Sequence, residues 1–208
     1  MNVATHERAP MEDTMPRTPI ATLGGTPLYP RDHLCVFFRG KNQRDQLLLP
    51  FLSEGLRAGH AVLFHAAHGE KETAWSLLGD KGDLELTEPE TGHLRDGRFA
   101  PAELLESLET WATRKHVSTG RPFGRIAGDM SWAAPILTPA LIDELVAEEV
   151  SVTGWMRRYP QITVCLYDLD LFGGDLIIPM IKAHPKVWMA GALTENPYYL
   201  TPEINPAG

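Results

Sequence analysis

The chain has 208 residues, 43% of them hydrophobic and 22% charged, which is ordinary for one globular domain with its own core. Its formal net charge of −8 argues against broad binding to nucleic acid or anionic lipid, since both need a basic surface. No apolar run approaches the roughly 20 residues of a membrane span, and no signal-peptide pattern opens the chain. We therefore expect a cytoplasmic protein without a nucleic-acid or membrane partner.

Residues 1–27 lack hydrophobic periodicity and are rich in Pro, Thr and Gly, so we expect a disordered N-terminal arm. After the arm, short apolar runs alternate with helical patterns. Strands are predicted at 34–38, 61–65, 84–86, 124–130, 162–168 and 186–193, and helices at 46–57, 70–78, 99–116, 138–160 and 175–185. Pro50 is expected in the first turn of its helix or at a kink. We expect one domain over 28–200 and a C-terminal tail over 201–208.

Strands separated by helices predict right-handed crossovers and a mainly parallel sheet covered on both faces. The fold class is therefore α/β, as a three-layer sandwich. In such sheets, ligands bind in the crevice beyond the carboxyl ends of the strands. The residues at those ends form a candidate rim: Phe38, Arg39, Gly40, His65, Asp129, Met130, Ser131, Trp132, Tyr167, Asp168 and Asp170.

The turn after the first strand is where many α/β proteins bind phosphate. A P-loop needs several glycines and a Lys followed by Ser or Thr, because backbone N–H groups wrap the phosphate and the Lys reaches its outer oxygens. Residues 37–46, FFRGKNQRDQ, have one glycine and no such Lys. The G-x-G-x-x-G pattern of dinucleotide sites is also missing. We therefore expect no nucleotide cofactor, and a crevice that is free for another ligand.

Five segments together resemble the MEDS sensory domain, a family named for methanogens, methylotrophs and a dichloromethane-responsive regulator. They are DHLCVFFRG, LPFLSEGLRAGHAVLF, RIAGDMSW, TVCLYDLDLFGG and KAHPKVWMAGALTENPYY, and they extend over about residues 30–200. The resemblance implies a degenerate relative of RecA- and KaiC-type ATPases without a functional P-loop. It also implies a sensor of small hydrocarbon derivatives.

Members of this family commonly occur beside histidine kinase, DNA-binding or anti-sigma modules, for which this chain has no room. We therefore expect a signal that passes to a partner (a histidine kinase, an anti-sigma factor or a transcription regulator) or through a homodimer. The expected ligand is a small, mostly apolar metabolite such as a hydrocarbon or one-carbon derivative.

His33 and Cys35 are two residues apart on the first predicted strand and therefore project from the same face. Together with Cys165 and His184 they could in principle hold zinc, but no short metal-ligand spacing supports this, so we predict no metal. The resemblance favours contacts with a ligand. Ordinary core packing is the alternative for all four residues, and no disulfide framework is indicated.

The other candidates also have two interpretations each. Asp129 either contacts a ligand or caps the following turn. Met130 and Trp132 would form a soft apolar wall for a small ligand, or belong to the core. Asp168 contacts a ligand or anchors the loop after its strand. The predicted ligand-binding set is His33, Cys35, Arg39, His65, Asp129, Met130, Ser131, Trp132, Cys165, Tyr167, Asp168 and His184.

Glu148 and Glu149 lie on the longest predicted helix and are expected on its solvated face. The sequence also has no G-x-S-x-G or other ordered nucleophile motif, which disfavours an enzyme without excluding one. Three functions remain open: a sensor of a small metabolite, a small-molecule enzyme that uses the strand-end crevice, and a ligand-free interaction module acting on a regulator. We favour the sensor.

Overall fold

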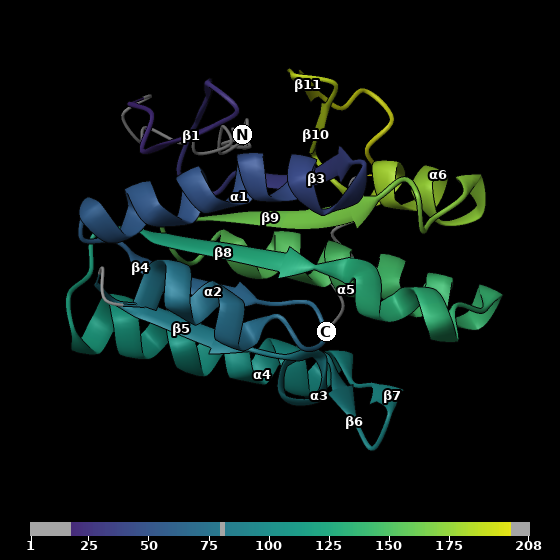
Figure 1. The fold of residues 1–208 in the computed structure, drawn as a ribbon, viewed down its shortest axis with the longest axis horizontal. Helices are drawn as coiled ribbons and strands as arrows, with labels where there is room; N and C mark the ends of the chain where they lie inside the picture. Colours follow the sequence, from purple (N-terminus) through teal and green to yellow (C-terminus); the bar gives the residue numbers. More distant parts are fainter. Residues whose placement is uncertain (1–17, 80–81, 201–208) are drawn as a thin grey trace, which may run out of the picture.

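The computed structural model describes residues 18–79 and 82–200, which form a three-layer α/β sandwich (Figure 1). The central sheet contains β3 (His33–Phe38), β4 (Ala61–His65), β5 (Leu84–Thr87), β8 (Gly124–Asp129), β9 (Gln161–Asp168), β10 (Lys186–Met189) and β11 (Ala192–Glu195). The strand order is β11-β10-β3-β9-β8-β4-β5, and every neighbouring pair is parallel except β10 with β11. The prediction of an α/β sandwich with a mainly parallel sheet is therefore confirmed.

Helices cover both faces of the sheet. They are α1 (Gly40–Arg57), α2 (Lys71–Leu78), α3 (Pro89–Gly92), α4 (Pro101–Ala112), α5 (Pro139–Met156) and α6 (Gly174–Ala183). Because side chains alternate along a strand, Val36 and Val164 pack under α1, whereas Phe37 and Cys165 belong to the core beneath α5 and α6. Helix α4 and the C-terminal half of α5 pack over Leu63 of β4 on this second face.

A small hairpin precedes the sheet and corrects the predicted arm over 1–27. Strands β1 (Ala21–Leu23) and β2 (Thr26–Leu28) pair antiparallel and pack against α1. Leu23 and Leu28 are fully buried, so burial of two leucines holds a segment whose composition alone indicated disorder. Residues 1–17 of the predicted arm and the predicted tail over 201–208 lie outside the described residues.

Two predicted boundaries also change. Helix α1 begins at Gly40 rather than at residue 46 and contains Pro50, whose exposed position lets water reach the carbonyl it leaves unpaired. The predicted strand over 186–193 is two antiparallel strands, because the chain turns at Ala190 and Gly191, both with positive φ. Shorter elements complete the fold: strands β6 (Leu94–Arg95) and β7 (Arg98–Phe99), a π-helical segment at Thr113–Ser118 and a 3-10 segment at Met130–Ile136.

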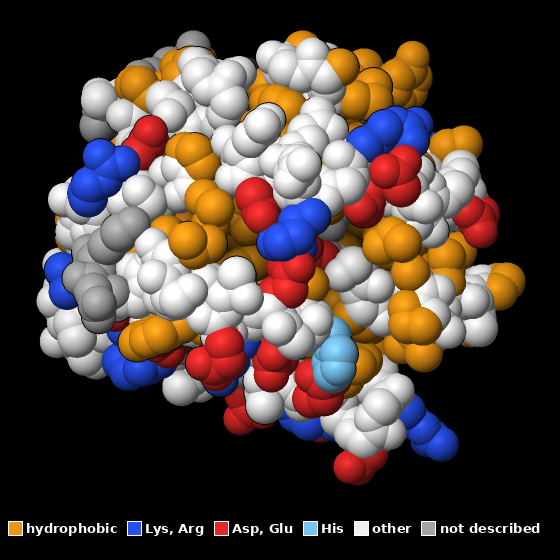
Figure 2. All heavy atoms as spheres, viewed as in Figure 1, with side chains coloured by type: hydrophobic (Ala, Val, Ile, Leu, Met, Phe, Trp, Pro, Cys, Tyr) orange, Lys and Arg blue, Asp and Glu red, His pale blue; other side chains and the backbone are white. Residues whose placement is uncertain are grey.

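Among the described residues, no helix combines the length and the apolarity needed to cross a membrane. The face shown in Figure 2 carries acidic and basic side chains interspersed among apolar ones, and the basic side chains visible there do not gather into a patch. This agrees with the acidic balance of the whole sequence.

Candidate functional site

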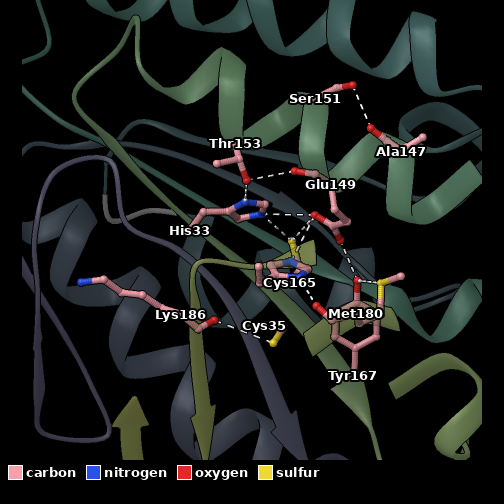
Figure 3. Close-up of polar contacts among 11 residues, drawn as sticks. His33, Cys35, Ala147, Glu149, Ser151, Thr153, Cys165, Tyr167, Met180 and Lys186 are labelled. Carbon is pink, nitrogen blue, oxygen red and sulfur yellow. Dashed lines mark hydrogen bonds and ion pairs between the residues drawn. The ribbon is translucent and has the colours of Figure 1, made fainter. Parts of the chain in front are cut away.

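A buried carboxylate, Glu149 of α5, lies at the centre of a cluster of polar side chains (Figure 3). Its Oε2 atom is 3.2 Å from Nε2 of His33 and 3.2 Å from Nε2 of His184. The Cys165 thiol lies 3.5 Å from the same oxygen and 3.5 Å from Nε2 of His33. The other carboxylate oxygen accepts a 2.6 Å hydrogen bond from the hydroxyl of Tyr167.

Four elements bring these residues together. His33 is the first residue of β3, and Cys165 lies in the middle of the adjacent strand β9. His184 caps the C-terminus of helix α6 and lies two residues before the start of β10, the other neighbour of β3. Helix α5 starts at the Thr138 cap with Pro139 in its first turn. It packs over these strands and places the Glu149 side chain against them.

The electrostatics of the cluster follow from its burial. Burial alone raises the pKa of Glu149, but the adjacent His184 and His33 more than reverse this effect, so the pKa lies well below its usual value. Burial and the nearby His184 lower the pKa of His33. Burial and the Glu149 carboxylate raise the pKa values of Cys165 and Tyr167 well above their usual range. Glu149 is therefore the anion of the cluster.

A cavity of about 30 Å³ adjoins the cluster on the same face of the sheet. Its walls come from the carboxyl-terminal halves of β4 and β8, from β9, and from helices α4 and α5. The lining residues are His65, His93, Leu104, Leu108, Ile126, Gly128, Met130, Glu148, Glu149, Val152, Thr163 and Cys165. Glu149 and Cys165 thus belong to both features. The cavity lies on a face of the sheet, between strands and helices, and not in the crevice beyond the strand ends where the sequence placed the ligand.

Several polar atoms around the cavity have no partner among the described residues. They are Nε2 of His65, Nδ1 of His93 and the Thr163 hydroxyl. Buried polar atoms are normally hydrogen-bonded, so unpaired ones beside a cavity are candidate contacts for a small ligand. Nδ1 of His65 is engaged by the Thr87 hydroxyl at 2.6 Å.

Burial also sets the charge of the cavity walls. It lowers the pKa of His65 to about 4. Burial and the neighbouring His65 lower the pKa of His93 well below its usual value. Burial and the adjacent Glu149 raise the pKa of Glu148 well above its usual value. At neutral pH the two histidines are uncharged, and each ring can both donate and accept a hydrogen bond.

The structure brings seven of the twelve predicted ligand-binding residues to these two features. His33, Cys165, Tyr167 and His184 surround Glu149, and His65 and Met130 line the cavity. Trp132 stacks on the cavity residue His93, with their ring centroids 5.0 Å apart.

The other five predicted residues lie elsewhere. The Asp129 carboxylate caps the following 3-10 segment by accepting from the backbone N–H of Ser131, and it forms a buried ion pair with Arg44 at 2.7 Å. Cys35 is the in-register partner of Cys165 but lies outside the cluster, with its thiol 3.8 Å from a backbone oxygen of Lys186.

Arg39 and Asp168 lie at the strand-end turn that the sequence singled out. Arg39 pairs with Asp170 at 2.6 Å on the exposed surface. The Asp168 carboxylate accepts hydrogen bonds from the backbone N–H groups of Gly40 and Asp170. The chain's own carboxylate therefore occupies the N–H group that a phosphate would bind at this turn.

Several site residues were missed by sequence reasoning, among them Glu148, Glu149 and His93. The expectation of a solvated face for the two glutamates is wrong, because both are buried. A signal for their burial existed in the helical spacing, since they continue the apolar stripe of Leu141, Leu145, Val152, Trp155 and Met156. His93 follows the short helix α3, where the sequence shows no periodicity to place it.

The fold and these features define an α/β domain with a small cavity and a cluster of buried polar groups on one face of its sheet. Residues 32–185 match the sequence model of the family described as MEDS, "MEthanogen/methylotroph, DcmR Sensory domain". The chain therefore belongs to this family of sensory domains.

The transcriptional repressor DcmR of Methylorubrum extorquens is 27% identical to this chain over 165 residues. The aligned region covers 76% of this chain and 59% of the repressor, so the chain spans less than two thirds of this relative's length. The family match and this relative support a regulatory role.

Proposed function

We propose that this domain senses a small, mostly apolar metabolite in the cavity beneath α4 and α5 and regulates a transcription or signalling partner. The observation that carries the proposal is the cavity itself, together with the unpaired polar atoms at its wall. Membership of a sensory family and similarity to a transcriptional repressor support the regulatory part.

The size and lining of the cavity indicate the ligand class. A volume of about 30 Å³ admits two or three water-sized groups, because one water needs roughly 10–15 Å³ on this measure. Leu104, Leu108 and Ile126 supply apolar walls, whereas His65 and His93 offer polar contacts. A one-carbon or short hydrocarbon derivative with one polar or polarisable atom meets both conditions.

Binding can be passed on through α5, because this helix contributes Glu148, Glu149 and Val152 to the cavity wall. A ligand that differs in affinity for two positions of α5 would shift the balance between them, and a partner that contacts this helix would read the shift.

The proposal is tested by adding dichloromethane, methanol and ethanol separately to the purified chain and following thermal unfolding and side-chain methyl NMR signals. Binding of any of them should raise the unfolding temperature and shift the methyl signals of Leu104, Leu108 and Val152. In Val152→Phe the aromatic ring fills the cavity, so both effects should be lost. The matched control is Val150→Phe on the same helix, because Val150 does not line the cavity.

If the wild-type chain and Val150→Phe respond no differently from Val152→Phe, the cavity is not the sensing site. A partner that is bound equally well by all three proteins would then favour a ligand-free interaction module.

A further inference from the structure

The hydrogen-bond network fixes which ring nitrogen of His184 carries its proton. The Nδ1 atom of His184 lies 2.8 Å from the backbone carbonyl oxygen of Met180. A carbonyl oxygen only accepts hydrogen bonds, so Nδ1 carries a proton, and in a neutral ring it is then the only protonated nitrogen. The Nε2 atom then presents a lone pair, and it makes no hydrogen bond among the described residues although it lies 3.2 Å from Glu149.

The same reasoning applies to His33. Its Nδ1 atom lies 2.7 Å from the hydroxyl oxygen of Thr153, and that hydroxyl donates its own proton to the backbone carbonyl of Glu149 at 3.0 Å (Figure 3). The Thr153 oxygen must therefore accept from Nδ1 of His33. The Nε2 atom of His33 is again the nitrogen with the lone pair, and it faces the cluster.

Two nitrogen lone pairs thus point to one carboxylate oxygen at 3.2 Å each, in a place with almost no solvent access. The thiol of Cys165 has a single proton and can satisfy only one of these acceptors. Acceptors that face each other without a shared proton repel, so a positive charge must lie between them, either a proton on one ring or a metal ion.

The separations between the four donor atoms fit a single ion. With metal bonds of about 2.0–2.1 Å to nitrogen or oxygen and about 2.3 Å to sulfur, ligands at the corners of a tetrahedron lie roughly 3.3–3.6 Å apart. Four of the six separations between these donor atoms are 3.2, 3.2, 3.5 and 3.5 Å, close to this range. All four donor atoms lie within 4.8 Å of one another.

We infer that His33, Glu149, Cys165 and His184 form a binding site for one transition-metal ion of the zinc class. Two imidazoles, a carboxylate and a thiolate are the ligands that such ions take, whereas Mg²⁺ and Ca²⁺ take oxygen ligands. The surrounding contacts are those of a metal centre: each ring donates its other N–H, and the second oxygen of Glu149 is held by Tyr167. The inference needs no ligand in the cavity and is independent of the proposed function.

The test uses the full chain, unfolded in a chelator, desalted, refolded and titrated with Co²⁺. Cobalt bound to a thiolate gives a sulfur-to-metal charge-transfer band, and one equivalent per chain should saturate it. The Cys35→Ala variant is the decisive protein, because the chain has two cysteines and Cys165 then supplies the only thiol. We expect Cys35→Ala to keep the band and the stoichiometry of one. Added Zn²⁺ should displace the bound Co²⁺ and thereby abolish the charge-transfer band.

The matched variant Cys165→Ala replaces the neighbouring buried cysteine in the same register. It should lose the charge-transfer band and bind Co²⁺ at least about 10-fold more weakly. A folded Cys35→Ala chain without the band overturns the inference, because the cluster is then an ion pair held by a proton. If either variant fails to fold, as judged by circular dichroism, the wild-type titration decides: one cobalt per chain with a thiolate band supports the site, and no binding overturns it.

Discussion

Thr153 shows how a residue that touches neither cavity nor carboxylate can still control the cluster. Its hydroxyl donates to the carbonyl of Glu149 one turn back and accepts from Nδ1 of His33, so it fixes the orientation and protonation of that ring. Contacts of this kind orient ligands and raise their basicity. The residue therefore belongs to the chemistry of the site, although its type and spacing are unremarkable for a helix.

We expect Thr153→Val to weaken Co²⁺ binding by about 10- to 100-fold while the chain stays folded. The valine keeps the shape of threonine but removes the acceptor for His33. Ser151→Ala is the matched control, because the Ser151 hydroxyl also donates to a carbonyl one turn back, at Ala147, but contacts no histidine. Equal cobalt affinities of the two variants would show that Thr153 has no role in metal binding.

A second residue-scale prediction concerns His60, which lies against Arg125. Its Nδ1 atom accepts a 3.2 Å hydrogen bond from the guanidinium of Arg125. Burial, and then the charge of Arg125, lower the pKa of His60 to about 4. Between about pH 6.5 and pH 4, His60 is protonated in the unfolded chain but stays neutral in the folded chain. Stability from this group is therefore complete above about pH 6.5 and falls as the pH decreases toward 4.

The loss is at most about 3 kcal/mol, since each pKa unit corresponds to about 1.4 kcal/mol. Urea unfolding of the wild-type chain and of His60→Gln at several pH values between 4 and 7 measures it. The glutamine can still accept from Arg125 but does not titrate, so its stability should fall less steeply with acid. Parallel curves for the two proteins would contradict the depressed pKa.

At the scale of elements, α5 links the two features of the site, the cavity and the cluster around Glu149. Its apolar stripe anchors it over the sheet, and the same stripe carries Glu148 to the cavity and Glu149 to the cluster. Burying a carboxylate is costly unless partners compensate it, and the histidines and tyrosine around Glu149 are those partners. The stripe that anchors α5 on the sheet therefore also positions both glutamates of the site.

The β1–β2 hairpin is the element for which composition was most misleading. Leu23 is 1% exposed and packs against the core beneath α1. We expect Leu23→Ala to lower the free energy of unfolding by about 2–5 kcal/mol, because it leaves a cavity in that core. Thr22→Ala, on the exposed face of the same strand, should change it by less than about 0.5 kcal/mol.

Urea denaturation of both variants shows whether the hairpin unfolds together with the rest of the domain. If Leu23→Ala is as stable as Thr22→Ala, the hairpin does not belong to the cooperative unit that unfolds.

At the scale of the whole molecule, the cluster joins segments from both ends of the described chain: β3 near its start, and α6 near its end. A metal held by both would stabilise only the folded state, because the four ligands are apart in the unfolded chain. Free metal at 100 times its dissociation constant would then add about 2.7 kcal/mol to the free energy of unfolding.

We expect the wild-type chain and Cys35→Ala to unfold at a lower temperature after chelation, and to recover when Zn²⁺ is added back. Cys165→Ala should show a much smaller difference between its chelated and zinc-loaded forms. Differential scanning calorimetry measures all six states. Identical unfolding temperatures of the wild-type chain with and without zinc would show that metal binding does not stabilise the fold.

Local patterns in the sequence determined the fold class, most element positions and the family. The alternation of short apolar runs with amphipathic helices predicted the parallel sheet, and His33 and Cys35 were placed on one face by the period of a strand. The segments DHLCVFFRG and TVCLYDLDLFGG carried the resemblance to the family that residues 32–185 match.

Only the tertiary structure decided which of these residues meet. His33, Glu149, Cys165 and His184 lie far apart in sequence, and their meeting depends on the strand order β10-β3-β9 and on the rotation of α5 above it. No local pattern encodes strand order, and residue type assigns a glutamate to solvent even where the helical spacing places it on the buried stripe. Cys35 and Cys165 are equivalent as sequence signals, yet the packing of α5 places one beside Glu149 and leaves the other outside the cluster.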